Sequence, residues 1–291
     1  MKFSIVIPSF QQAEFLRATL QSVLTQDYAE REILVRDGGS TDGSVEILRE
    51  LGASGEIQWL SGPDGGQAAA INSGLSAATG DICAYLNSDD IYYAGTLRRV
   101  ADYFAAHPEC LVLYGNADHL HRDGSVMESY LVEPWDYERL ATICFLCQPA
   151  VFWRRAVMDR FGPFDPELRY AMDYEYWLRV GKAIAFHRLD GPPLAGSRLH
   201  ADTKTLSKRV PVHEESLQVV LRHGGSRPAV LKWLRALAHY RLEAASPPPA
   251  TKLGRAAIYV RNLFAAARQY GVPLRGDLFA HATKALLNRQ K

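Results

Sequence analysis

The sequence of 291 residues predicts an α/β fold with a doubly wound, mostly parallel sheet and a helical extension at its C-terminal end. Over the first hundred residues, short apolar runs alternate with amphipathic helical patterns, which is typical of strands joined by crossover helices. The length suffices for one large domain with a helical appendage. From about residue 228 the pattern is helical only, interrupted at 247–249 by three prolines, which a helix interior does not tolerate.

The expected elements follow in a regular order. Strands are expected at 3–7, 31–36, 56–60, 82–86 and 183–188. Helices are expected at 12–25, 67–78, 96–106 and 154–161, and two more begin near Thr41-Asp42, whose side chains can cap a helix, and near Asp173. The segment between 106 and 152 is strand-rich and irregular. The predicted domains are therefore a catalytic-type α/β domain over 1–225, with halves 1–110 and 111–225, and a helical region over 226–291.

Composition excludes several classes of protein. The hydrophobic share of 47% and the charged share of 22% are ordinary for soluble proteins, and no apolar run approaches eighteen residues, so no spanning helix is expected. The start, MKFSIVIPSF, lacks the features of a signal peptide, which predicts a cytoplasmic location. Four cysteines favour reduced thiols, and the Cys144-x-x-Cys147 pair lacks the second ligand pair of a zinc site.

Charge is distributed unevenly along the chain. Residues 222–291 carry thirteen Lys and Arg against two acids, a net charge of +11, while the rest of the chain carries −10. A basic, helical C-terminal region can bind an anionic membrane surface or a phosphorylated acceptor, or it can simply be a solvated face. No base-stacking platform or RNA-binding motif accompanies these charges, so no nucleic-acid partner is expected.

Polar side chains follow each of the first four predicted strands. These segments are Pro8-Ser9-Phe10, Asp37-Gly38-Gly39-Ser40, the stretch from Gly62 to Gln67, and Asn87-Ser88-Asp89-Asp90. In an open α/β sheet, ligands bind at the carboxyl ends of the strands. Glycine permits close approach of the backbone, and carboxylates or amides can hold a ribose, a base or a metal ion. The pattern predicts a nucleotide site at this edge.

The phosphates of such a ligand would need a cation. No G-x-G-x-x-G and no phosphate-binding loop follows the first strand, so the backbone cradle of those motifs is missing. The adjacent acids Asp89 and Asp90 would repel each other unless a divalent cation bound them, although a turn or a helix cap is the commoner role of such a pair. Their place after an apolar strand favours a metal site.

Taken together, these motifs resemble family 2 glycosyltransferases over about residues 2 to 205. The matching segments are SIVIPSF, VLTQDY, ILVRDGGSTDGSVEIL, GPDGGQAAAINSGLSAATGDICAYLNSDD, QPAVFWRR, GPFDPELRYAMDYEYWLR and Arg198-Leu199-His200. The resemblance implies a GT-A-like fold, with a Rossmann-like nucleotide-binding half and an acceptor half. It also implies an inverting transferase with a nucleotide-diphosphate-sugar donor, UDP- or dTDP-linked, and a Mn²⁺ or Mg²⁺ ion.

The resemblance also implies roles for individual residues. The donor-binding set is Pro8, Ser9, Phe10, Asp37, Asp64, Gln67, Asn72, Asn87 and Ser88. Asp89 would be a metal ligand, and His200 would complete the metal or diphosphate site. Two positions depart from the family pattern: Asn87 replaces the first aspartate of its D-x-D motif, and Ala69 stands where relatives often carry an aspartate, which affects the choice of sugar.

Asp173 matches the acidic pair that supplies the catalytic base in this family. The base takes a proton from the acceptor hydroxyl while that oxygen attacks the anomeric carbon opposite the departing diphosphate, and a single displacement inverts the configuration. Near the start of a helix, Asp173 could instead only complement the helix dipole.

The expected partners are the nucleotide-sugar donor and a glycan or lipid-linked acceptor, as in bacterial surface polysaccharide biosynthesis. The basic helices could place the enzyme at the inner face of the cell membrane, pack on the catalytic domain or form a homodimer. Two other functions stay open: a nucleotidyltransferase-like enzyme, which normally has a phosphate loop after the first strand, and an inert sugar-nucleotide-binding scaffold, which would not need Asp89 or Asp173.

Overall fold

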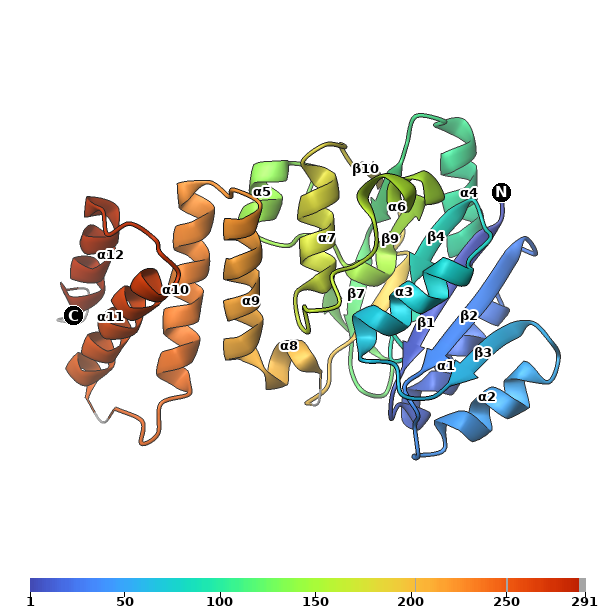
Figure 1. Ribbon diagram of the computed structural model, residues 1–291, viewed down its shortest axis with the longest axis horizontal. Coiled ribbons are helices and arrows are strands. Elements are labelled where there is room, and N and C mark those ends of the chain that lie inside the picture. The colour runs from blue at the N-terminus through green and yellow to red at the C-terminus, as the bar shows by residue number, and fades with distance from the viewer. Residues whose placement is uncertain (202, 250, 288–291) are drawn as a thin grey trace. The chain divides into compact units, whose positions relative to one another are not determined.

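The computed structural model describes residues 1–201, 203–249 and 251–287 (Figure 1). The chain divides into two compact units. Unit 1 comprises Met1–Leu140 and Cys144–His200, and unit 2 comprises Ala141–Ile143 and Ala201–Lys291. This division falls earlier in the chain than the domain boundary predicted near residue 225, because α9 (Arg209–Arg222) packs against α10 (Arg227–Glu243).

Unit 1 is built on a seven-stranded sheet with the order β10-β6-β9-β4-β1-β2-β3. These strands are β1 (Phe3–Ser9), β2 (Arg31–Asp37), β3 (Ile57–Ser61), β4 (Ile82–Tyr85), β6 (Val112–Gly115), β9 (Val151–Arg154) and β10 (His187–Leu189). Strands β3, β2, β1 and β4 are mutually parallel, and β9 is antiparallel to β4 and β6. The prediction of a doubly wound, mostly parallel sheet is confirmed.

Helices from the first 181 residues occupy the connections between these strands, and all but the end of α5 belong to unit 1. They are α1 (Ala13–Leu24), α2 (Ser44–Gly52), α3 (Gln67–Ala77), α4 (Thr96–Ala106), α5 (Tyr137–Thr142), the short η1 (Gln148–Ala150), α6 (Arg155–Phe161) and α7 (Met172–Gly181). The helices predicted from periodicity are observed within a few residues of their expected bounds. The strand expected over 183–188 is shorter and later, as β10.

A second sheet of four strands has the order β5-β11-β7-β8. Its strands are β5 (Ile91–Tyr92), β7 (Ala117–Leu120), β8 (Val126–Ser129) and β11 (Ala195–Arg198). It brings β11, which comes late in the chain, beside β5, which follows β4 almost directly. The segments after β4 and after β11 therefore meet.

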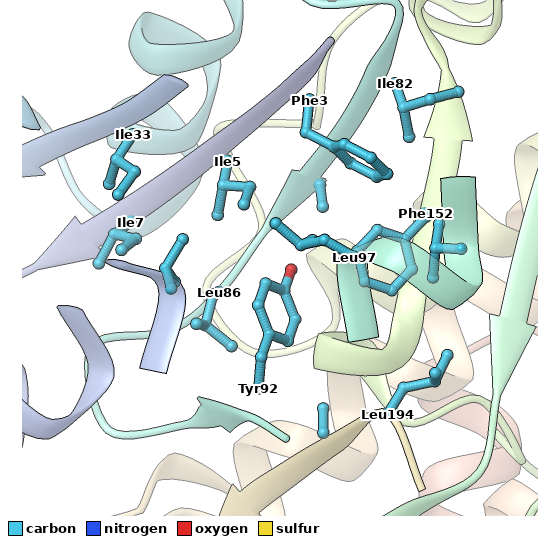
Figure 2. Packing of buried hydrophobic residues seen from close by; sticks show 14 of the residues in the cluster. Phe3, Ile5, Ile7, Ile33, Ile82, Leu86, Tyr92, Leu97, Phe152 and Leu194 are labelled. Carbon is cyan, nitrogen blue, oxygen red and sulfur yellow. The ribbon is translucent and has the colours of Figure 1, made fainter. Parts of the chain in front are cut away.

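The main core lies on one face of the large sheet (Figure 2). Side chains that alternate along β1 and β2, among them Ile5, Ile7 and Ile33, pack with Leu97 of α4 and Phe152 of β9. The same cluster contains buried residues of α1 and α2. Alternate burial on a strand places the remaining side chains on the opposite face, towards α3.

The α3 helix packs closely on that opposite face. Gly74 lies so near β1 that a Cβ atom there would come within 2.4 Å of a methyl carbon of Val6. The N-terminal half of α3 lies beside the carboxyl end of β2, since its Ala69 and Ala70 line one pocket with Asp37. The polar segment after β2 therefore shares one edge with the start of α3.

Unit 2 is a helical unit formed by α8 (Lys204–Ser207), α9, α10, α11 (Lys252–Gln269) and α12 (Gly276–Leu287). Apolar residues of α10, such as Leu234 and Leu237, are buried, and α10 packs against α9 and α11. Helix α9 precedes the predicted helical region: its buried residues gather at its C-terminal end, and Pro211 stands in its first turn, so its sequence pattern is weak. No helix in the described ranges is long and apolar enough to span a bilayer.

Candidate active site

A hydrogen bond between backbone groups connects the carboxyl ends of β1 and β2. The Gly38 N–H donates to the Ser9 carbonyl at 2.8 Å. The side chain of Ser9 is buried, and its Oγ has no hydrogen-bond partner among the described residues. Because buried hydroxyls are almost always paired in folded proteins, Ser9 is suited to bind a ligand at this edge. Pro8 precedes it in β1.

Phe10, Gly38 and Asp64 surround one small space. A Cβ atom at residue 38 would lie 3.1 Å from Cδ2 of Phe10 and 3.3 Å from Oδ2 of Asp64. The Phe10 ring is 59% exposed. The Asp64 carboxylate is fixed by the Gly66 N–H, which donates to its Oδ1 at 2.8 Å. Glycine at residue 38 thus lets the exposed Phe10 and the Asp64 carboxylate both lie close to the backbone, where a Cβ atom would be crowded by the two.

Asp37 is buried and its carboxylate organises the loop after β2. It accepts hydrogen bonds from the backbone N–H groups of Gly39 and Ser40, from the Ser40 hydroxyl at 2.6 Å and from the Ser61 hydroxyl of β3 at 2.7 Å. These donors occupy most of the four lone-pair sites of a carboxylate. Asp37 therefore connects the ends of β2 and β3, in addition to the base contact that the resemblance implies.

A pocket of about 420 Å³ opens beside this edge. It is lined by Arg36 and Asp37 of β2, by residues 60–64 at the end of β3, and by Ala69, Ala70 and Ser73 of α3. Asp37 and Asp64, both predicted site residues, lie in its wall. Arg36 was missed, although a charged residue near the end of an apolar strand was a visible signal.

The end of β4 carries a network of amides. Nε2 of Gln67 donates to Oδ1 of Asn87 at 2.7 Å, and Nδ2 of Asn87 donates to Asp90 and Gln148 at 3.2 and 3.3 Å. Gln148 in turn donates to the Tyr85 carbonyl. The structure thus brings the predicted residues Gln67 and Asn87 together and adds Gln148, which sequence reasoning did not select.

The turn after β4 is anchored to α1. The Thr19 hydroxyl lies 2.9 Å from the Ser88 carbonyl oxygen and 2.8 Å from that of Asp90. Ser88 itself is buried. The hydrogen bonds from Thr19 therefore fix the turn that carries Ser88 and Asp89 to α1. This contact positions the Asp89 side chain.

Asp89 and His200 are brought together from distant parts of the chain. Nε2 of His200 lies 3.2 Å from Oδ2 of Asp89. The His200 ring packs against Phe15 of α1, with centroids 5.0 Å apart, and Arg198 donates from Nε to the Asp89 carbonyl at 2.9 Å. The guanidinium of Arg198 also lies over Phe15. Phe15 and Arg198, both missed in the sequence, thus orient the pair.

The two neighbouring aspartates differ in environment. Asp90 is buried, accepts from the Arg198 backbone N–H at 2.8 Å, and has a pKa well above its usual range because of burial and the Asp89 charge. The Asp89 side chain is 19% exposed. Asp89 can therefore reach a ligand, whereas Asp90 joins β4 to β11. The sequence alone did not distinguish the two.

Asp173 lies at the start of α7 and is partly exposed. Its Oδ1 accepts from the Tyr174 N–H at 2.7 Å. The pKa of Tyr85, at the end of β4, is raised by burial and by the charges of Asp173 and Asp90. Asp173 therefore lies near enough to Tyr85 for its charge to disfavour ionisation of the phenol.

Asn72 has a different environment from the other predicted donor-site residues. Its Nδ2 donates to the Phe164 carbonyl at 2.8 Å, and the Phe164 N–H donates to its Oδ1 at 3.0 Å. Phe164 packs on Tyr176 of α7, with centroids 4.2 Å apart. The amide of Asn72 thus connects α3 to the segment before α7.

Asp89 and His200 are the two described side chains at this edge that could hold a divalent cation together. Within the described ranges, no group of three or more His, Cys, Asp or Glu side chains could hold a metal ion. Adjacent ligands of an octahedral ion lie about 3.0 Å apart when each bond is about 2.1 Å. The Asp89–His200 distance of 3.2 Å is close to this value. A mixed oxygen and nitrogen pair suits Mn²⁺, with the remaining positions left for phosphate oxygens and water.

Comparison with known proteins assigns the class. The model of "Glycosyl transferase family 2" matches residues 4–159, more than half of the chain. A crystal structure of S. aureus TarS 1–349 in complex with UDP-GlcNAc has a TM-score of 0.63 at 19% identity, and covers 99% of this chain and 89% of that one. A mannosyltransferase from Pyrobaculum calidifontis, in complex with GDP-Man and Mn²⁺, has a TM-score of 0.60 at 17% identity, and covers 99% and 88%. These likenesses show a GT-A-type fold.

The chain belongs to glycosyltransferase family 2. A PGL/p-HBAD biosynthesis glycosyltransferase of Mycobacterium bovis is 31% identical over 183 residues, which are 61% of this chain and 68% of that protein. An uncharacterized glycosyltransferase of Nostoc sp. is 29% identical over 180 residues, or 57% of this chain. The match spans about half (55%) of the length of the Nostoc protein. The prediction of the family is confirmed.

Proposed function

We propose that the protein transfers a sugar from a nucleotide-diphosphate sugar to a hydroxyl of a glycan or lipid-linked acceptor, with inversion at the anomeric carbon. One arrangement carries this proposal: the Asp89 carboxylate, after β4, lies 3.2 Å from the His200 imidazole, after β11, and a further carboxylate, Asp173, stands at the start of α7. The reaction needs a cation that neutralises the diphosphate and a separate carboxylate that accepts the proton of the acceptor. Asp89 with His200 could supply the first, and Asp173 could supply the second.

The donor binds along the carboxyl edge of β1, β2 and β4. Ser9 offers a buried hydroxyl, Phe10 an exposed ring and Asp64 a fixed carboxylate for the nucleoside. Gln67 and Asn87 hold each other beside the position of the diphosphate. A divalent cation held by Asp89 and His200 would neutralise phosphate charge and stabilise the leaving group.

Asp173 acts as the general base. Its carboxylate takes the proton of the acceptor hydroxyl, the acceptor oxygen forms the new bond to the anomeric carbon, and the bond from that carbon to the diphosphate oxygen breaks. The products are the glycosylated acceptor and a nucleoside diphosphate. Because attack and departure occur on opposite sides of one carbon, the configuration inverts.

The substrates are proposed from the relatives. TarS was crystallised with UDP-GlcNAc, and a hyaluronan synthase of Pasteurella multocida is 25% identical over 230 residues, 78% of this chain but 23% of that protein. Together with the PGL/p-HBAD biosynthesis relative, this supports a UDP- or dTDP-linked donor and a role in a bacterial surface polysaccharide or glycolipid. The family match favours a glycosyltransferase over the nucleotidyltransferase alternative.

The helices of unit 2 are proposed to bring the enzyme to an anionic membrane surface on the cytoplasmic side. The apolar face of α10 is buried, so the contact would rely on basic side chains and on exposed apolar residues such as Leu253 and Phe279, which are 72% and 51% exposed. Sedimentation with anionic and neutral vesicles tests this contact. A homodimer formed through the same helices would appear as a doubled mass in analytical ultracentrifugation.

The proposed activity is tested by thermal stabilisation and product analysis. Wild type and Asp89→Ala are heated with a panel of nucleotide sugars, with and without Mn²⁺. We expect metal-dependent stabilisation by one diphosphate donor, lost in the variant, and transfer of that sugar with inversion. Metal-dependent donor binding without any transfer or hydrolysis would favour the inert scaffold, and indifference to every donor would contradict the proposal.

A further inference from the structure

Arg235 of α10 has a buried N–H donor without an acceptor in the described part of the chain. The residue is partly exposed, whereas its Nε atom is buried and has no hydrogen-bond partner among the described residues. A buried donor that is left unpaired destabilises a fold, and an arginine presents five N–H donors in one rigid fork. The guanidinium of Arg235 is therefore suited to bind a ligand.

The carboxylates of α10, α11 and α12 already have other partners. These helices contain two acidic residues, Glu243 and Asp277. Glu243 lies 3.1 Å from Nε2 of His239. Both oxygens of Asp277 accept from Arg227, at 2.8 and 2.9 Å, and this bidentate ion pair lowers the pKa of Asp277 to about 2. Neither carboxylate is left to neutralise the Arg235 charge.

A tyrosine and a histidine lie beside Arg235. Helix α11 packs against both α10 and α12. The hydroxyl oxygen of Tyr259 in α11 lies 2.9 Å from Nε2 of His281 in α12. Burial and the charges of Arg235 and Lys284 lower the pKa of His281, and the Arg235 charge also opposes the rise that burial causes in the pKa of Tyr259. Arg235 therefore lies near enough to both side chains for its charge to act on them.

The chemistry of this cluster favours an anion. The guanidinium donates from several N–H groups, the tyrosine hydroxyl can donate its proton, and the imidazole can donate from a ring nitrogen. Lys284, three residues after His281 in α12, adds a second positive charge on the same side of the helix. Donors from three helices reach a ligand from different directions, which suits the three terminal oxygens of a phosphate group better than the two coplanar oxygens of a carboxylate.

We propose that Arg235, Tyr259 and His281 form a binding site for a phosphate group, either that of a lipid headgroup or that of a soluble phosphate. All three residues belong to unit 2, and the site does not depend on the proposed sugar transfer. A bound phosphate gives Arg235 the counterion that its neighbouring helices lack, and it favours protonation of His281 from solvent. Protonated Nε2 then donates to the Tyr259 oxygen, which leaves the Tyr259 proton to donate to the phosphate.

Sulfate is the probe for this site, because it has the tetrahedral shape of phosphate and keeps its charge between pH 6 and pH 8. It is titrated at constant ionic strength, and the ring signal of His281, assigned with His281→Gln, is followed by NMR. We expect Arg235→Gln to weaken sulfate binding at least about 10-fold, since hydrogen bonds between charged groups are the strong ones. Tyr259→Phe, which removes one oxygen, should weaken it about 2- to 10-fold.

Arg261→Gln is the matched control. Arg261 is an exposed arginine of α11, two residues after Tyr259 and so on another face of the helix. The control removes the same charge, and its affinity for sulfate should stay within about 2-fold of wild type.

The pH dependence of binding is a second readout. Sulfate should raise the pKa of His281, and wild type should bind sulfate at least about 3-fold more tightly at pH 6 than at pH 8, because binding and protonation favour each other.

Vesicles distinguish the two sources of the phosphate. Phosphatidylcholine vesicles with phosphatidate expose a phosphate monoester, and vesicles of matched surface charge with phosphatidylglycerol expose only a phosphodiester. A lipid source predicts that sedimentation with the phosphatidate vesicles falls at least about 10-fold in Arg235→Gln and not in Arg261→Gln. Equal sedimentation of the two variants, with sulfate binding weakened only in Arg235→Gln, assigns the site to a soluble phosphate.

Two results overturn the inference. The first is a His281 signal that does not respond to sulfate. The second is equal weakening of sulfate binding in Arg235→Gln and Arg261→Gln, which assigns the binding to the basic surface as a whole. Melting of each ligand-free variant checks that it folds. If Arg235→Gln does not fold, Tyr259→Phe takes its place, and unchanged sulfate binding in that variant also overturns the inference. None of these outcomes bears on sugar transfer, which is measured separately.

Discussion

The imidazole of His200 lies 3.2 Å from the carboxylate of Asp89, although 111 residues separate them in the chain. Two features of the fold produce this contact. The antiparallel pairing of β5 with β11 brings the end of the β4 turn beside the segment that ends at His200, and Phe15 of α1 supports the imidazole ring. The pair is held by secondary structure on both sides, so its geometry does not depend on a ligand.

Removal of either member of this pair should abolish most of the activity. We expect Asp89→Asn and His200→Gln each to lower kcat/KM at least about 100-fold, because a site with two protein ligands loses half of them. Titration of Mn²⁺ against donor-dependent fluorescence or heat should show weaker metal binding in both variants. His239→Gln, a change at an exposed histidine of α10, is the control and should behave as wild type. Full activity of His200→Gln would remove the histidine from the site.

Asp173→Asn should lower the rate of sugar transfer without weakening the binding of the donor. General base catalysis contributes about 10²- to 10⁴-fold to a rate, so kcat should fall by that factor. Donor affinity should stay within about 2-fold, since the side chain is proposed to meet the acceptor rather than the nucleotide. Single-turnover transfer and donor titration measure the two quantities. Asp102→Asn, at an exposed position of α4, serves as the control. Loss of donor binding equal to the loss of rate would assign Asp173 to the donor site.

The sequence predicted the fold well for a physical reason. In unit 1 most strands and helices show the hydrophobic pattern typical of their own secondary structure. The polar segments after the first four strands are local in the sequence, so they can be recognised without knowing how the chain packs. Asp64 and Asn87 were selected as candidates in this way. The antiparallel β9 and the second sheet were not predicted, because short strands such as β5 and β11 have too few residues to show alternation.

The candidate site residues that were not predicted from the sequence have one property in common. Each of them matters because of a contact with a residue far away in the chain. Arg198 lies 109 residues after Asp89 in the chain and donates to its carbonyl, and Gln148 of η1 accepts from Asn87. Neither residue belongs to a local pattern that predicts its neighbours. Asn72 shows the converse. It belongs to a strong motif, but its partner Phe164 lies 92 residues away, and only the structure shows that its amide is occupied there.

Asn72→Ala should therefore destabilise the fold more than it affects the donor. Loss of the amide leaves both the N–H and the carbonyl of Phe164 without their present partner, at a cost of about 1–3 kcal/mol in the free energy of unfolding. Urea denaturation measures this cost. Nucleotide affinity of the folded variant should remain within about 2-fold of wild type. An affinity loss of 10-fold or more with unchanged stability would return Asn72 to the donor site.

Glu32 should make folding sensitive to acid. Burial raises the pKa of its carboxyl, but hydrogen bonds from Lys2, Ser4 and Thr79 outweigh burial and lower the pKa to about 2. The Lys2 Nζ lies 2.7 Å from Oε2, and the Thr79 N–H donates to Oε1 at 2.6 Å. A depressed pKa stabilises the fold above the unfolded value of about 4.3, and this stabilisation is lost as pH falls towards 2.

Glu32→Gln should consequently be less stable than wild type at pH 7, by up to about 3 kcal/mol, the free energy that corresponds to a shift of this size. The gap should be constant above about pH 5 and should narrow as pH falls from 4.5 towards 2, as Glu32 of the wild type becomes protonated. Thermal denaturation across this range measures the gap. Glu56→Gln, at an exposed carboxylate near the same end of the sheet, should show a small effect. If the Glu32→Gln gap stayed the same from pH 7 down to pH 3, the stabilisation would come from packing or neutral hydrogen bonds and not from the charge of Glu32.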